Sequence, residues 1–129
     1  MLHTIHTKGS VSELLVALYF LNQGHQVYFP VVRQGKVDLI VENFKDKTLT
    51  KVQVKTASWN TADGYKYLQC RTRTTNKFQR IPLDGDYDCL VVVYENEMWV
   101  IPSSIVSSSN ITLRDEKNGR TWDKYKVKP

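Results

Sequence analysis

The sequence predicts an α/β fold, because one helical pattern near the N-terminus is followed by several short runs of strand-forming residues. The helical pattern covers residues 11–21, where apolar side chains recur every three or four positions. It ends at Asn22, Gln23 and Gly24, which form a typical helix stop. A chain of 129 residues with 41% hydrophobic residues can bury one core. We therefore expect a single domain over residues 1–129.

The predicted helix is apolar around most of its circumference. Val11, Leu14, Leu15, Leu18 and Leu21 form one apolar stripe, and the residues between them widen it. A helix that is apolar on all sides is usually covered on all sides. We therefore expect this helix to pack on more than one side.

Runs of strand-forming residues begin after Gly24, and Pro30 suggests that the first of them is an edge strand or is interrupted. Two later runs at residues 89–94 and 98–101 suggest a buried pair. The last residues, 114–129, mix basic and acidic side chains without clear periodicity, so we expect a surface strand and a loose basic tail there. The predicted strands are residues 27–32, 37–41, 51–55, 65–70, 89–94 and 98–101.

The overall charge favours a polyanionic partner, since 18 Lys and Arg residues face 13 Asp and Glu residues. The same surplus is also compatible with an ordinary basic protein. Cys70 and Cys89 are isolated and lack zinc-site spacing, so we expect reduced core thiols. The N-terminus lacks a signal-peptide pattern, and no run of about 18 apolar residues is present to span a bilayer. We expect a cytoplasmic protein that does not enter a membrane.

The runs at 37–41 and 51–55 suggest a β-hairpin that gathers three polar side chains. Strand residues two apart share a face, so Gln53 and Lys55 point the same way. A turn centred between Lys45 and Asp46 places Asp38 opposite Gln53. Moving the turn centre by one residue places Asp38 opposite Lys55 instead. Either register collects Asp38, Gln53 and Lys55 on one face.

These three side chains suit phosphodiester hydrolysis. A carboxylate and an amide oxygen are the hard ligands that Mg²⁺ accepts, and Mg²⁺ keeps most of its waters. A nearby ammonium group can orient the attacking water or stabilise charge that grows on the phosphate. The three histidines suggest no catalytic role, which counts against a nuclease of the HNH type.

The order of these residues resembles the core of the PD-(D/E)xK nucleases. A helix bearing Glu13 is followed by Val37-Asp38-Leu39-Ile40 and then by Val52-Gln53-Val54-Lys55-Thr56-Ala57. The resemblance covers residues 8–57 and, more loosely, the strands near 87–102. It is strongest to the small intron-encoded homing endonucleases and weaker to the archaeal Holliday-junction resolvases. It implies a restriction-endonuclease-like core, with a central mixed β-sheet flanked by helices.

The resemblance also implies roles for the site residues. Asp38 would be the central metal ligand, Gln53 would supply an oxygen, Lys55 would be the catalytic lysine, and Glu13 would reach the metal. The cofactor would be Mg²⁺, with Mn²⁺ as a substitute. Val37 replaces the proline of the motif, and Gln53 replaces its second acid, which removes one negative charge from the site.

Glu13 has a second interpretation. Ser10 and Glu13 match a capping box, in which the glutamate side chain bonds back to the N-terminus of the helix. Mutation separates the two roles, because a lost cap lowers stability whereas a lost metal ligand lowers activity.

A cluster of basic residues lies between Trp59 and Arg80, where Asp63 is the single acid. The cluster is a candidate phosphate-contacting surface, although a solvated strand and loop would have the same composition. Aromatic residues among these cations could stack on bases but could equally belong to the core. The candidate DNA-binding residues are Lys66, Arg71, Arg73, Lys77 and Arg80.

The resemblance implies a metal-dependent endonuclease that acts on double-stranded DNA at specific sites, as homing endonucleases do. One alternative is a structure-specific nuclease that resembles the Holliday-junction resolvases. Another is a non-catalytic DNA-binding module with a degenerate nuclease fold, for which the neutral Gln53 is the best argument. A single site of this kind cuts one strand, so we expect a homodimer or homotetramer if both strands are cut.

Overall fold

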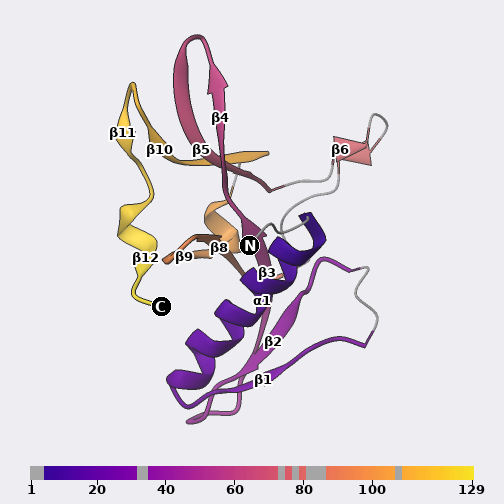
Figure 1. The fold of residues 1–129 in the computed structure, drawn as a ribbon. Coiled ribbons are helices and arrows are strands. Elements are labelled where there is room, and N and C mark those ends of the chain that lie inside the picture. Colours follow the sequence, from indigo (N-terminus) through magenta and orange to yellow (C-terminus); the bar gives the residue numbers. More distant parts are fainter. Residues whose placement is uncertain (1–4, 32–34, 73–74, 77–78, 81–86, 107–108) are drawn as a thin grey trace.

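The structure is a computed structural model that describes residues 5–31, 35–72, 75–76, 79–80, 87–106 and 109–129 (Figure 1). Its elements are α1 (Ile5–Asn22), β1 (Gln26–Tyr28), β2 (Leu39–Glu42), β3 (Leu49–Thr56), β4 (Ser58–Ala62), β5 (Tyr65–Arg71), β6 (Thr75–Asn76), β7 (Gln79–Arg80), β8 (Cys89–Tyr94), β9 (Glu97–Pro102), η1 (Ser103–Ile105), β10 (Asn110–Asp115), β11 (Gly119–Arg120), η2 (Asp123–Tyr125) and β12 (Lys126–Val127).

A six-stranded mixed sheet forms the centre of the molecule, with the strand order β1-β2-β3-β8-β9-β12. The β3 and β8 strands run parallel, and the other neighbours are antiparallel. Within the parallel pair, Gln53 lies beside Leu90. The central mixed sheet that we expected is therefore confirmed, and β3 is one of its inner strands.

Helix α1 covers one face of this sheet (Figure 1). Val16 of the helix packs with Leu39, Val52, Val54 and Val91 of the strands in one buried cluster. The helix begins at Ile5, six residues earlier than its apolar pattern indicates. The first turns carry mainly polar residues, which give no apolar periodicity to detect.

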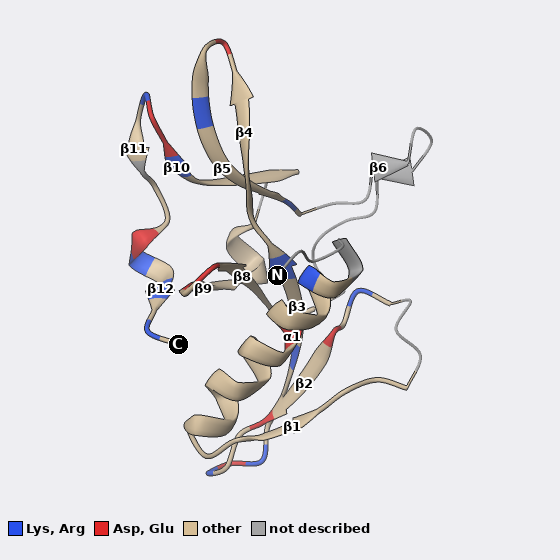
Figure 2. Ribbon diagram, viewed as in Figure 1, with Lys and Arg blue, Asp and Glu red and all other residues tan. Residues whose placement is uncertain are grey.

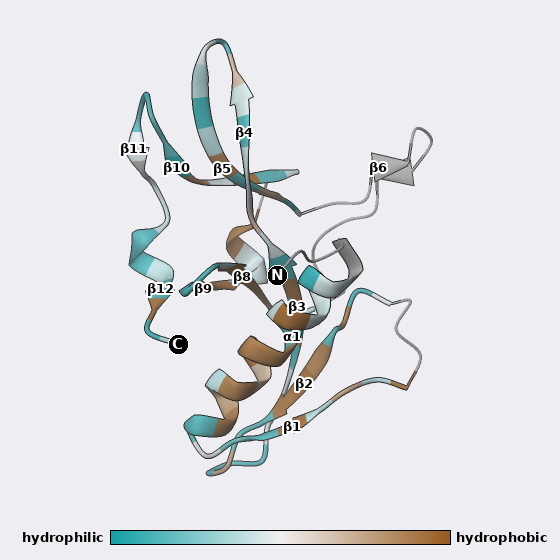
Figure 3. Cartoon of the chain, viewed as in Figure 1, coloured by the Kyte–Doolittle hydropathy of each residue, from teal (hydrophilic) through white to brown (hydrophobic). Residues whose placement is uncertain are grey.

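The outer side of α1 differs from our expectation. We expected the helix to be packed on more than one side, but the structure packs it on the sheet alone among the described residues. Leu14 is 62% exposed and Leu18 is 53% exposed. Figure 3 shows that the helix is nevertheless apolar along most of its length. No helix within the described residues has the length and apolar composition needed to cross a membrane.

The opposite face of the central sheet is covered by a second sheet rather than by the helices that we expected. This sheet has the strand order β11-β10-β5-β4. The β3 strand runs into β4 through Ala57, whose amide donates to the Val93 carbonyl at 2.9 Å. The chain therefore leaves the first sheet as a strand and builds the second one directly. The core between the sheets is formed by Ala57, Leu68, Cys70, Tyr87, Leu90, Val92, Trp99, Ile101, Val106, Ile111 and Leu113.

The C-terminal segment is an integral part of both sheets, so the expectation of a loose tail over residues 114–129 is wrong. Arg114 and Asp115 end β10, as the predicted surface strand requires, and β12 pairs with β9. The carboxylate of Glu97 forms ion pairs with Arg114 and with Lys126, the latter at 2.7 Å. Long-range strand pairing and ion pairs hold this segment, and neither follows from local periodicity.

Replacing Glu97 with glutamine is expected to lower the free energy of unfolding by about 1 kcal/mol at neutral pH. Partial burial alone would raise the pKa of Glu97, but Lys126 and Arg114 together hold it below its usual range. A depressed carboxylate pKa contributes stability above the ordinary pKa, and this stability is lost as the pH falls through the lowered value. The difference between wild type and Glu97→Gln in urea unfolding should therefore shrink from pH 7 to about pH 3. A pH-independent difference would contradict this account.

Candidate active site

Asp38 is held against β3 on both sides of Gln53. Its backbone amide donates to the Val52 carbonyl at 2.8 Å, and its carboxylate oxygen Oδ2 accepts the amide of Val54 at 2.7 Å. Leu39, the next residue, pairs with Val52 in the ladder between β2 and β3. Continuing this register by one residue places Asp38 opposite Gln53. The structure therefore selects the first of the two registers that we considered.

Gln53 is buried on the face of β3 that points away from α1. Its neighbours Val52 and Val54 belong to the cluster under the helix, so the alternation of the strand turns Gln53 toward the other side. The side chain is 8% exposed, and its Oε1 atom has no hydrogen-bond partner among the described residues. Buried acceptors are rarely left without a partner. This oxygen is thus suited to a ligand that the protein itself does not supply.

Lys55 lies two residues along the same face and is half-buried. It approaches the second sheet, where its ammonium group influences the thiol of Cys70. Burial raises the pKa of Cys70 to about 12, and the positive charge of Lys55 opposes this increase. Cys70 therefore stays a neutral thiol. Local sequence patterns do not predict this proximity, because Cys70 lies on β5 of the second sheet.

Glu13 lies inside α1, eight residues after the helix begins, so the capping-box interpretation is wrong. Ser12, its chain neighbour, is buried and shares a 2.6 Å hydrogen bond with the hydroxyl of Thr56. Since Thr56 follows Lys55, this bond fixes α1 against the end of β3 that carries the candidate lysine. The Ser12–Thr56 pair was not among our candidates. The metal-binding role of Glu13 stays a prediction.

The candidate DNA-binding residues are not brought together on β5. Lys66 and Arg71 are both exposed, but they are five residues apart on a regular strand and therefore point to opposite faces. Figure 2 shows the hairpin of β4 and β5 extending beyond the central sheet, with a basic segment on β5. Arg73 and Lys77 lie outside the described residues, and only the backbone of Arg80 is described. The DNA-binding surface stays a prediction.

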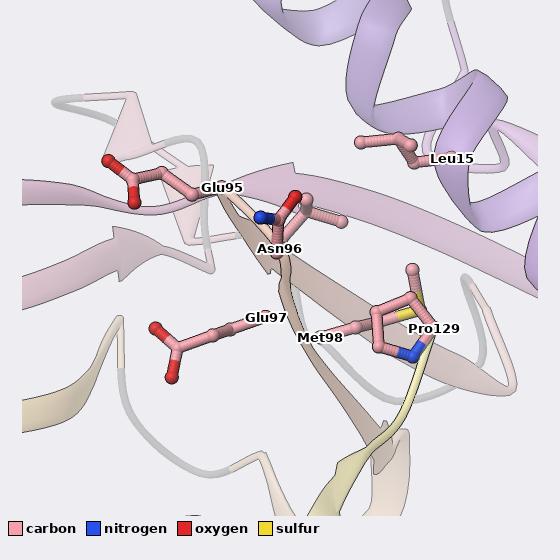
Figure 4. Close-up of a pocket in the computed structure, with 7 residues that line it drawn as sticks. Leu15, Glu95, Asn96, Glu97, Met98 and Pro129 are labelled. Carbon is pink, nitrogen blue, oxygen red and sulfur yellow. The ribbon is translucent and has the colours of Figure 1, made fainter.

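A pocket of about 340 Å³ lies elsewhere, beside the turn between β8 and β9. Figure 4 shows Leu15, Met98 and Pro129 on one side of it, while the carboxylates of Glu95 and Glu97 point away from Leu15. Asp38, Gln53 and Lys55 do not line this pocket. It is therefore separate from the candidate active site.

The donor set fits a hard divalent cation that retains its waters. Within the described ranges, His, Cys, Asp and Glu side chains form no group of three or more that could hold a metal. An ion at this site would thus have the Asp38 carboxylate and the neutral oxygen of Gln53 as its protein ligands. Mg²⁺ accepts one or two carboxylates with oxygen ligands and water, whereas zinc sites draw mainly on nitrogen and sulfur. The observation that supports this fit is the Oε1 atom of Gln53, which is buried and accepts no hydrogen bond from the part of the chain that the structure describes.

Comparisons with known proteins agree with the residue pattern and with the fold. The family model described as PD-(D/E)XK endonuclease matches residues 3–126. Protein 5.3 of Escherichia phage T7 is 38% identical over 98 residues, covering 74% of this chain and 77% of the phage protein. A solved structure of a bacterial homing endonuclease has a TM-score of 0.77 at 24% identity, covering 96% of this chain and 89% of that one, and this likeness concerns the fold. The chain therefore belongs to the PD-(D/E)XK endonuclease family.

Proposed function

We propose that the chain is a metal-dependent endonuclease that hydrolyses phosphodiester bonds of double-stranded DNA at specific sites. The observation that carries this proposal is a fixed carboxylate beside a buried amide oxygen that has no hydrogen-bond partner among the described residues. Asp38 is hydrogen-bonded to the backbone of Val52 and Val54, and Gln53 is the residue between these two. Site specificity is supported by the likeness in fold to the bacterial homing endonuclease.

Asp38 and Gln53 would hold Mg²⁺ or Mn²⁺, which would supply Lewis-acid stabilisation of the phosphate and a more acidic bound water. Lys55 supplies a positive charge beside them on the same strand face. Its ammonium group orients the attacking water or stabilises the negative charge that grows on the phosphate oxygens. Helix α1 covers the sheet face opposite to Gln53, so the expected metal-binding role of Glu13 is not part of this proposal. Such a site cuts one strand, so a double-strand break takes two copies of the chain.

The proposal is tested by incubating the protein with a diverse DNA library and with a four-way junction, followed by sequencing of the ends. Wild type is expected to cut with Mg²⁺ or Mn²⁺ and not with EDTA. Lys55→Ala should cut about a hundredfold to a thousandfold more slowly, because it loses a charge aimed at the transition state. Lys51→Ala is the matched control, since Lys51 is exposed on the same face of the same strand.

The outcomes separate the alternatives. Defined cuts in linear duplex support the site-specific enzyme, whereas cuts confined to the junction favour a structure-specific nuclease. Salt-sensitive binding without cleavage under any metal condition would favour a non-catalytic DNA-binding module, as the neutral Gln53 allows.

A further inference from the structure

The outer face of α1 carries a row of exposed apolar residues with the spacing of a helix–helix contact. Val11, Leu14, Leu18 and Leu21 follow one another at intervals of three, four and three residues. We call these four residues the α1 seam. This spacing is the heptad pattern, in which apolar residues three and four positions apart on one helix pack between the side chains of a second helix. A helix that only covers a sheet needs no such row on its outer side.

No described residue of this chain covers the α1 seam. Its members are between 39% and 62% exposed, and the flanking Leu15 is 37% exposed. The inner face of the same helix is already occupied, since Ser12, Val16 and Ala17 are buried. Monomeric soluble proteins rarely leave a continuous apolar patch of this kind in water. The helix therefore has two apolar faces, and the chain uses one of them.

The lack of charge on the outer face of α1 favours an uncharged protein surface as its partner over a nucleic acid. From residue 9 to the end of α1, Glu13 is the one charged side chain, and it is half-buried toward the sheet side of the helix. Figure 2 shows the helix free of charged residues over most of its length. The α1 seam therefore lacks the cations that a phosphate backbone attracts. It also lacks like charges that would repel a second seam.

The intervals between the residues of the α1 seam are the same whether they are counted from the N-terminus or from the C-terminus of the helix. Intervals of three, four and three are symmetric about residue 16, so Leu14 of one helix can face Leu18 of an antiparallel copy, and Val11 can face Leu21. Two-fold contacts between identical chains need this self-complementarity. We infer that the α1 seam is the surface through which two copies of this chain associate. The choice of a second copy rests in part on the proposed function, since a double-strand cut takes two single-site chains.

The test is the mass of the full chain by sedimentation equilibrium at micromolar concentration, without DNA or metal. Wild type is expected to have at least twice the mass of one chain, and the double variant Leu14→Glu/Leu18→Glu should have the mass of one chain. Leu49→Glu is the matched control, because Leu49 is 60% exposed on β3 and lies outside the seam. Circular dichroism checks that both variants are folded. A wild-type mass of one chain, or an unchanged mass in the double variant, would overturn the inference.

Cross-linking provides a second readout. A cysteine at Leu18 should give a covalent dimer with a short bis-maleimide, whereas a cysteine at Leu49 should not. The native thiols contribute little background, because Cys70 and Cys89 are buried and burial raises the pKa of each to about 12. Equal cross-linking at both positions would contradict the inference. Both measurements are independent of cleavage, so failure of the proposed nuclease activity would remain distinguishable.

Discussion

Replacing Asp38 with asparagine is expected to reduce metal-dependent DNA cleavage by at least about a hundredfold while leaving the fold as stable as wild type. The side-chain oxygen of asparagine can still accept the amide of Val54, which the carboxylate accepts at 2.7 Å in wild type. The negative charge is lost, and with it the main attraction for a divalent cation. Cleavage rates at several Mg²⁺ concentrations, together with urea unfolding, measure the two effects separately.

Asp38→Ala is the companion variant. It removes both the charge and the acceptor, so it should lose cleavage and also about 1–3 kcal/mol of unfolding free energy, because the Val54 amide loses its partner. Cleavage by Asp38→Asn at the wild-type rate would show that this carboxylate is structural. A stability loss in Asp38→Asn as large as that in Asp38→Ala would show that the asparagine does not replace the hydrogen bond.

Replacing Trp99 with alanine is expected to lower the free energy of unfolding by about 3–5 kcal/mol. Trp99 is fully buried in the core between the two sheets, and the ammonium group of Lys126 lies 5.7 Å from its ring centre. Truncation would open a large cavity at the junction of the sheets. Chemical unfolding monitored by circular dichroism gives the loss directly.

Trp99→Phe is the control for this prediction. The indole Nε1 atom has no hydrogen-bond partner among the described residues, so phenylalanine removes no bond and leaves a smaller cavity. Its effect should be clearly smaller than that of alanine. Equal losses in the two variants would mean that ring volume does not determine the stability at this position.

The hairpin that carries the candidate site could be predicted from the sequence, because the residue patterns that specify it lie within one short segment of the chain. Alternation along residues 37–41 and 51–55, with a polar turn between them, places Asp38 near Gln53 and Lys55, and the structure has this arrangement. The parallel neighbour β8 was recognisable as a strand from its apolar run. Its pairing with β3 depends on a long connection and was not recognisable.

The strand at residues 65–70 was expected and is β5, but its assembly into a second sheet could not be predicted, because the other strands give weak local signals. All five residues of β4 are exposed, and β11 has only two residues. Exposed strands have little apolar alternation, and strand order is set by contacts between distant segments. The same limit explains the error at Glu13. The Ser10 to Glu13 pattern fits a helix start, and nothing local shows that the helix already began at Ile5.

The position of Asp38 next to the edge of the central sheet would link the proposed catalysis to local unfolding. Among the described residues, β1 alone lies beyond β2 in the strand order, and it has three residues, so this edge has few backbone hydrogen bonds that resist opening. Opening of β2 would separate Asp38 from the amide of Val54 even while the core around Trp99 stays intact. The protein would then remain folded by most spectroscopic measures and yet have no assembled site. Amide exchange at Asp38 and Val54 would report the lifetime of the assembled site more closely than the melting temperature would.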